Sequence, residues 1–238
     1  MILITSEIKL ADAIHSNYLL IPVITRFGIR LGFGDKTVKA VCKEHGVDVE
    51  FFTTILNVFS HESYFPQDRL LRFDVAQLVG YLQKTHGYYR TVLIPMLDKN
   101  MEAFVESAAR PGEPEVRLIK NFFAQYKDEL MAHLKREETI TFPYITELVK
   151  KENTVLLHKK YSMKVFESEH DNVEEKLYDL KSILIKYLQG DYDEGARNSL
   201  IFNIFRLEKD LKDHTRIEDK ILTPIVKQME QALFGSNA

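Results

Sequence analysis

The chain has 238 residues, 45% of them hydrophobic and 28% charged, so it can bury the core of one large domain, or of an ordinary domain with a small companion. Its formal net charge of -3 provides no basic field for nucleic acid, and no stretch reaches the roughly 18 apolar residues of a membrane span. Cys42 is the single cysteine, which excludes a disulfide within the chain and makes a reducing, cytoplasmic location the expectation.

The first part of the chain, residues 1–64, is predicted to form a small helical domain, because glycines and a proline divide it into short segments. Long periodic stretches follow Pro66, and they predict a second domain over residues 70–235. Residues 37–56, with Gly46 in the turn, also match a helix-turn-helix. This stretch has few Lys or Arg residues and several acidic ones, so nucleic acid is not an expected partner.

The second domain is predicted to contain four long helices separated by short clusters of turn residues. Short loops between long helices make antiparallel neighbours, so the predicted fold is all-α: an up-and-down four-helix bundle. The predicted helices cover residues 73–107, 114–151, 154–189 and 193–231. Pro95, Pro143 and Pro224 fall inside three of them, nine or ten residues after a histidine, where a proline costs about 3 kcal/mol unless packing absorbs it.

Each predicted helix carries an apolar stripe with the spacing that faces a bundle interior, and one histidine interrupts each stripe. On the first helix the stripe continues through Tyr89 and Leu93 to Met96, and on the second it continues through Ile140 to Tyr144. Two stripes also carry a glutamate four residues after the histidine. The polar residues of the four stripes are His86, His133 with Glu137, His170, and His214 with Glu218.

These stripe residues predict a metal site. A single histidine on an apolar stripe is more often a hydrogen-bonded core residue than a ligand, but here every helix has one. Burying an ionised glutamate without a partner costs several kcal/mol, and neither Glu137 nor Glu218 has an obvious cationic side chain at its level. About 16 to 21 residues separate each histidine from the adjoining predicted loops, so all four are expected at one depth of the bundle.

The predicted ligands are four nitrogens and two carboxylates without a thiolate. Six such ligands suit iron or manganese, because zinc normally stops at four. Two carboxylates among four imidazoles suggest two ions about 3.5–4 Å apart, with Glu137 and Glu218 both bridging. If each ion takes about six ligands and an oxo or hydroxo group also bridges the pair, one open position is left on each ion.

The sequence around these residues resembles the hemerythrin-like, HHE cation-binding family, and within it the repair-of-iron-centres branch, the ScdA/YtfE-like di-iron proteins. His133 and Glu137, and likewise His214 and Glu218, follow the family form of histidine, three residues, glutamate and then an apolar run to a proline. The resemblance implies two non-haem iron ions bridged by an oxo or hydroxo group and by both carboxylates, with manganese or zinc as substitutes. It makes His86, His133, His170 and His214 the terminal ligands. It also implies a role in nitrosative or oxidative stress: restoring iron–sulfur clusters by iron delivery or by handling nitric oxide.

The N-terminal segment resembles the small domain of the same family, in Phe27-Gly28-Ile29 and from Lys36 through Cys42 to Asp48. The family form has two adjacent cysteines in the loop that here reads Leu31-Gly32-Phe33-Gly34-Asp35, so this chain lacks the cysteine pair. Cys42 is expected to pack in the core. A homodimer through the small domain is a further implication of the resemblance.

Three functions remain open from the sequence. The first is a di-iron protein that repairs iron–sulfur clusters, with dioxygen or nitric oxide as ligands and iron–sulfur proteins as partners. The second is a di-iron sensor or storage module for dioxygen or nitric oxide, without repair activity. The third is a structural bundle whose polar residues form a hydrogen-bond network without metal. Glu174, one turn after His170, is an alternative further ligand, although a solvated position is the simpler interpretation.

Overall fold

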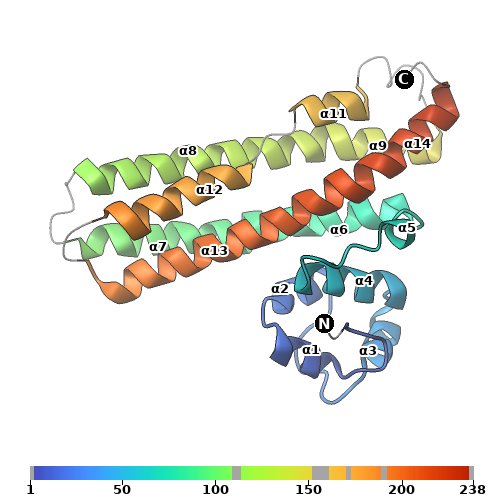
Figure 1. Ribbon diagram of the computed structural model, residues 1–238, viewed down its shortest axis with the longest axis horizontal. Coiled ribbons are helices and arrows are strands. Elements are labelled where there is room, and N and C mark those ends of the chain that lie inside the picture. The colour runs from blue at the N-terminus through green and yellow to red at the C-terminus, as the bar shows by residue number, and fades with distance from the viewer. Residues whose placement is uncertain (1–2, 109–113, 152–160, 170–172, 189–191, 236–238) are drawn as a thin grey trace. The chain divides into compact units, whose positions relative to one another are not determined.

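The computed structural model describes residues 3–108, 114–151, 161–169, 173–188 and 192–235 (Figure 1). These residues are mostly helical. The β-pairing among them is an isolated antiparallel bridge between Lys9 and Thr37. The all-α prediction is therefore confirmed. Among the described residues, no helix combines the length and the apolar character that a bilayer-spanning segment needs.

The chain divides into two compact units. The first comprises Met1–Thr85 with Arg216–Ile225, and the second comprises His86–Thr215 with Val226–Ala238. Two long helical segments, Val75–Ser107 and Glu194–Phe234, pass from one unit into the other without a break in their helical backbone. The predicted domain boundary near residue 64 stays a prediction.

Short helices build the N-terminal part of the first unit, and two of them, α3 and α4, have side-chain caps. The Thr37 hydroxyl accepts a hydrogen bond from the Ala40 amide (3.2 Å), and the Asp48 carboxylate accepts one from the Phe51 amide (2.7 Å). Gly46 lies between the two capped helices with φ of 63°, a left-handed conformation that glycine adopts without a steric penalty. The helices are α1 Leu10–Ser16, α2 Leu20–Arg26, α3 Val38–His45, α4 Val49–Ser60 and α5 Gln67–Leu70.

Cys42 lies on α3 in the core of the first unit and is fully buried. Burial raises the pKa of its thiol to about 11, and the nearby carboxylate of Asp48 adds to the effect. Because the thiolate is the reactive form, the thiol is inert near neutral pH. Cys42 therefore acts as a packing residue, as expected.

Long helical segments make up the rest of the structure. The first, second and fourth run unbroken and end within three residues of their predicted limits. Their elements are α6 Val75–Tyr88, η1 Tyr89–Leu93 and α7 Ile94–Ser107; α8 Pro114–Arg136, η2 Glu137–Thr141 and α9 Phe142–Lys150; and α13 Glu194–Ile217, η4 Glu218–Leu222 and α14 Thr223–Phe234. The third comprises α11 Met163–Glu169, α12 Val173–Ser182 and η3 Ile183–Tyr187.

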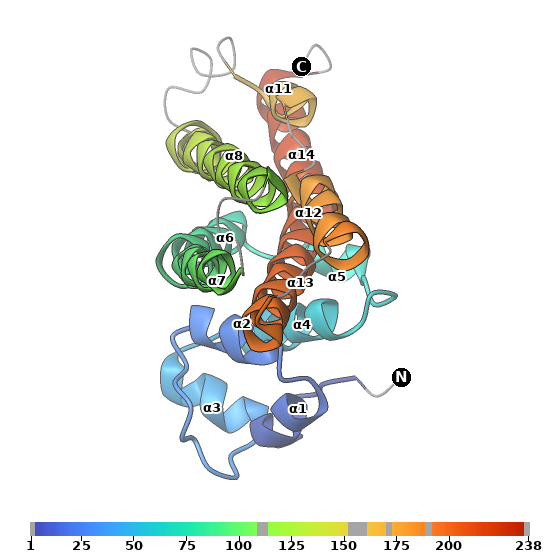
Figure 2. The same ribbon diagram turned by 90° about the vertical axis from the view of Figure 1, so that its left-hand side faces the viewer.

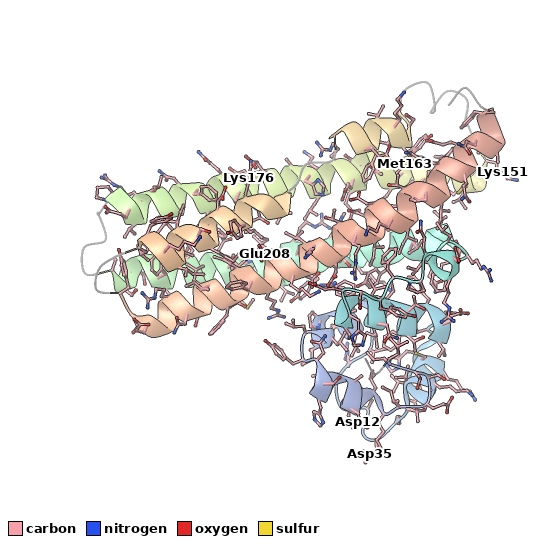
Figure 3. The ribbon with its side chains drawn as sticks, in the orientation of Figure 1. Asp12, Asp35, Lys151, Met163, Lys176 and Glu208 are labelled. Atoms are coloured by element: carbon pink, nitrogen blue, oxygen red, sulfur yellow. The ribbon has the colours of Figure 1, made fainter. Side chains whose placement is uncertain are left out.

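The start of the third helix differs from the prediction. Tyr161 and Ser162 are not helical, and α11 begins at Met163 instead of belonging to a helix that starts at residue 154 (Figure 3). The carboxylate of Glu230 on α14 accepts a hydrogen bond from the Met163 amide at 2.9 Å. A distant side chain thus satisfies the amide that a preceding helical turn would otherwise satisfy, and sequence periodicity does not reveal such a contact.

In the second unit, α7, α8, α12 and α13 surround one apolar core, and Figure 2 views these helices nearly end-on. Two ion pairs join these helices: the exposed Lys176 on α12 donates to Glu129, and the buried Lys181 donates to the partly exposed Glu208. Figure 3 labels Lys176 and Glu208. Fully buried members of the core include Leu97, Phe104, Ile119, Leu200 and Ile204. The arrangement is that of a helix bundle stabilised by burial of its apolar stripes.

In the part of the chain that the structure describes, each long helical segment contains one five-residue π-helical turn, labelled η1 to η4. The backbone bonds span five residues, as from the Ile94 amide to the Tyr89 carbonyl and from the Phe142 amide to the Glu137 carbonyl. Pro95, Pro143 and Pro224 each come two residues after the end of such a turn. A proline ring collides with the carbonyl four residues earlier and cannot donate to it, and a one-residue shift of the bonding pattern relieves both problems. This explains how the prolines fit inside long helices.

Within η2 the π-helical turn moves the buried position by one residue. Ile140 was predicted to face the interior, but its side chain is 44% exposed and the neighbouring Thr141 is fully buried. On the first helix Met96 is partly buried and packs against the apolar core, as predicted, next to the fully buried Leu97. The prediction for Ile140 was wrong because it assumed an uninterrupted period of 3.6 residues.

Candidate metal centre

His86 lies near the end of α6, three residues before η1, and its side chain is fully buried. Its Nε2 atom lies 3.2 Å from Glu137 Oε2 and 3.2 Å from His214 Nε2. Its Nδ1 atom lies 2.9 Å from Glu138 Oε1. The ring of Phe142 stacks on the imidazole, with centroids 5.3 Å apart and planes 26° from parallel. Both ring nitrogens and one ring face of His86 are therefore held by neighbours.

His133 and Glu137 lie one turn apart, at the end of α8 and the start of η2. His133 Nε2 is 3.4 Å from Glu137 Oε1, while Glu137 Oε2 is the oxygen that approaches His86. The Glu137 side chain is only 1% exposed. One buried carboxylate thus presents its two oxygens to histidines of two different helices, which is the arrangement that a bridging ligand requires.

His214 and Glu218 repeat the same spacing at the end of α13 and the start of η4, and both are buried. One potential ligand atom from each of His86, Glu137, His214 and Glu218 lies within 4.8 Å of the others. His133 joins this group through its contact with Glu137. The structure therefore brings together five of the six side chains that the sequence predicted as ligands.

The remaining predicted ligand, His170, lies outside the described residues. The side chain of Glu174, the alternative further ligand, also lies outside them, although its backbone belongs to α12. The predicted equal depth of the four histidines therefore stays a prediction for the third helix.

Sequence reasoning missed two carboxylates beside the predicted ligands. One is Glu138, which contacts His86. The other is Asp210 on α13, which is 6% exposed and accepts a hydrogen bond from the Tyr89 hydroxyl at 2.7 Å. The Tyr89 ring also packs edge-on against His214, with centroids 5.9 Å apart. A usable signal existed for Asp210, because it precedes His214 by one helical turn.

The donor set suits a cation. His86 Nε2, Glu137 Oε2 and His214 Nε2 converge, and each can offer a lone pair to the same space. A single proton can lie between only one pair of these atoms, whereas a metal ion accepts lone pairs from several ligands at once. Two buried carboxylates in this region add negative charge that a cation offsets. The mixture of imidazole and carboxylate without thiolate is typical of iron and manganese sites.

Comparison with known proteins agrees with this chemistry. Residues 77–226 match the hemerythrin HHE cation-binding domain. The chain belongs to the hemerythrin HHE cation-binding family. It is also similar to the iron-sulfur cluster repair protein ScdA of Staphylococcus haemolyticus: the two are 20% identical over 224 residues, which cover 92% of this chain and 98% of that protein. The family and the buried histidine–glutamate cluster together define a hemerythrin-like protein with a metal-binding site.

Proposed function

We propose that the chain is a non-haem di-iron protein that restores damaged iron–sulfur clusters under nitrosative or oxidative stress. The observation that carries the proposal is the convergence of buried imidazoles and carboxylates around His86 and Glu137. The similarity to ScdA, whose name describes iron–sulfur cluster repair, supports the choice of process. The buried, single Cys42 supports a reducing, cytoplasmic location.

Under this proposal His86, His133, Glu137, His214 and Glu218 hold the metal, and His170 is the sixth ligand. Glu137 and Glu218 act as bridges, since each can direct its two oxygens to different ions. When bound, two iron ions supply open coordination positions for dioxygen or nitric oxide and reversible one-electron chemistry.

The protein's own residues control access and geometry. The described ligand side chains are at most 3% exposed, so bulk water is kept from the site. Phe142 fixes one face of His86, and Tyr89 packs against His214 while donating to Asp210. These contacts hold two ligand rings in place before metal arrives, which reduces the entropy lost on binding.

Metal analysis of the purified protein is the first test. About two iron ions per chain are expected, with absorption bands of an oxo-bridged pair. Less than one metal ion per chain after anaerobic loading with Fe(II) would overturn the di-iron assignment. It would leave the third interpretation of the sequence, a bundle with an internal hydrogen-bond network.

Repair is tested with an iron–sulfur hydratase that nitric oxide has inactivated. The protein, loaded with ⁵⁷Fe, is expected to restore hydratase activity, whereas its Glu137→Leu variant is not. Transfer of ⁵⁷Fe into the repaired enzyme indicates iron delivery, and repair that uses only added natural-abundance iron indicates handling of nitric oxide. Reversible binding of dioxygen or nitric oxide without any recovery contradicts the repair proposal and favours the sensor or storage function.

A further inference from the structure

Glu138 lies directly beside a predicted metal ligand without being one of the predicted ligands itself. Its Oε1 atom is 2.9 Å from Nδ1 of His86, while the preceding residue, Glu137, approaches Nε2 of the same ring at 3.2 Å. One imidazole is therefore held between two carboxylates that are adjacent in sequence. The inference below rests on the proposed metal-binding function of this site.

The π-helical turn explains how two adjacent residues reach one ring. In an α-helix consecutive side chains diverge by about 100°, so Glu137 and Glu138 would face different directions. Both belong to η2, which begins at Glu137 and in which the Phe142 amide bonds to the Glu137 carbonyl. The wider turn reduces the divergence between neighbouring side chains. Pro143, two residues after η2, favours this turn over a regular α-helix.

The contact with Glu138 supplies a hydrogen-bond acceptor on the side of His86 that faces away from the other predicted ligands. Carboxylate oxygens lie near both ring nitrogens, Glu138 at Nδ1 and Glu137 at Nε2, and a carboxylate oxygen only accepts hydrogen bonds. A metal ion needs the lone pair of Nε2, so in the metal-binding form the hydrogen is on Nδ1 and Glu138 accepts it. In a neutral imidazole the other nitrogen, Nε2, then has the free lone pair. Nε2 is the atom that points toward Glu137 and His214.

The exposure of the two side chains suits this role. The His86 side chain is 0% exposed, whereas that of Glu138 is 20% exposed, so the carboxylate of Glu138 keeps part of its hydration. It can remain charged without the desolvation cost of a fully buried group. The negative charge next to Nδ1 also increases the basicity of Nε2 as a metal ligand.

We propose that Glu138 is a positioning residue for the metal centre: it holds His86 with hydrogen on Nδ1 and directs the Nε2 lone pair to the metal. Carboxylates that accept from metal-binding histidines typically change metal affinity by 10- to 100-fold when they are removed. The proposal gives Glu138 a function distinct from that of Glu137, which contacts the side of the ring that binds metal.

The test uses Glu138→Ala, which removes the acceptor, and Glu138→Gln, which keeps an acceptor but removes the charge. Glu102→Gln is the matched control, because Glu102 is an exposed helical glutamate on α7. In the metal-free, ¹⁵N-histidine-labelled protein, NMR is expected to find hydrogen on Nδ1 of His86 in the wild type and in Glu138→Gln. In Glu138→Ala the hydrogen is expected to move to Nε2, facing Glu137.

The second measurement is Fe(II) affinity, by anaerobic competition with a chelator. Glu138→Ala is expected to bind roughly 10- to 100-fold more weakly than the wild type, Glu138→Gln to fall between them, and the control to match the wild type. Wild-type hydrogen position and wild-type affinity in Glu138→Ala would overturn the inference. If the wild type itself binds no Fe(II), the proposed function fails, and the NMR measurement still decides whether Glu138 orients His86.

Discussion

The second unit of this protein contains two equally buried levels of very different chemistry. The apolar level, formed by Leu97, Phe104, Ile119, Leu200 and Ile204, consists of side chains with no exposed area. The polar level, formed by His86, His133, Glu137, Asp210 and His214, is almost as inaccessible, with exposures of 0% to 6%. The helices that supply both levels are continuous.

The difference shows what each level contributes. Burial of apolar surface stabilises the apolar level by itself, at roughly 25 cal/mol per Å². The polar level gains little from burial, because its carboxylates and imidazoles lose hydration. Binding of a cation therefore explains the composition of the polar level. The apolar level supplies the stability that allows the protein to bury these polar side chains.

The largest effect is expected from removing the carboxylate at the centre of the polar level. Glu137→Leu should lose one or both metal ions and keep the helical fold, because leucine suits a fully buried helical position. Metal quantification and circular dichroism measure the two properties separately. Glu102→Leu, at an exposed helical glutamate, serves as the control and should keep its metal. Full metal content in Glu137→Leu contradicts the bridging role.

The reverse behaviour is expected at the apolar level. Phe104→Ala leaves a cavity among fully buried side chains and should lower the free energy of unfolding by about 3–5 kcal/mol. Its metal content per folded chain should stay unchanged, because Phe104 lies several helical turns after His86, the proposed ligand on the same helical segment. Chemical denaturation combined with metal analysis gives both numbers. Loss of metal at full stability would show that the two levels are not independent.

A smaller loss of stability is expected from removing a buried hydrogen bond that involves no proposed metal ligand. The Tyr144 hydroxyl donates to Glu230 at 2.5 Å, and the pKa of Tyr144 is raised by burial and then by this hydrogen bond, so the hydroxyl stays protonated. Tyr144→Phe should cost about 1.5–3 kcal/mol, the range for a hydrogen bond to a charged group. Denaturant unfolding measures it, and metal content should equal that of the wild type. A cost below about 0.5 kcal/mol, which is the usual range for surface substitutions, contradicts this role.

The smallest change in stability is expected at Ile140, and it tests whether this side chain faces outward, as observed, or inward, as a regular α-helix predicts. Ile140→Ala should change the free energy of unfolding by less than about 0.5 kcal/mol, because the side chain is 44% exposed. Had Ile140 faced the interior, the cost would be about 2–5 kcal/mol. Leu97→Ala, at a fully buried position that follows η1, provides the comparison and should fall in that larger range. Equal costs for the two variants would contradict the shifted stripe.

Much of this molecule follows from the sequence because its signals are local. Turn residues placed the ends of three long helices within three residues, and the all-α class followed from their periodicity. The spacing of His133 with Glu137 puts both on one helix face whatever the rest of the fold does. Ile140 was misplaced because a π-helical turn changes the period by one residue, and the period was assumed constant.

The amino-acid sequence by itself determined the helical class, the apolar stripes and the ligand candidates, because each depends on residues a few positions apart. Tertiary structure decided which atoms of different helices meet: His86 with Glu137 and Glu138, Tyr89 with Asp210, and Glu230 with the start of α11. These contacts join residues 51 to 121 positions apart, from His86 with Glu137 to Tyr89 with Asp210. Such pairs are set by packing and by the π-helical turns, and local periodicity contains neither.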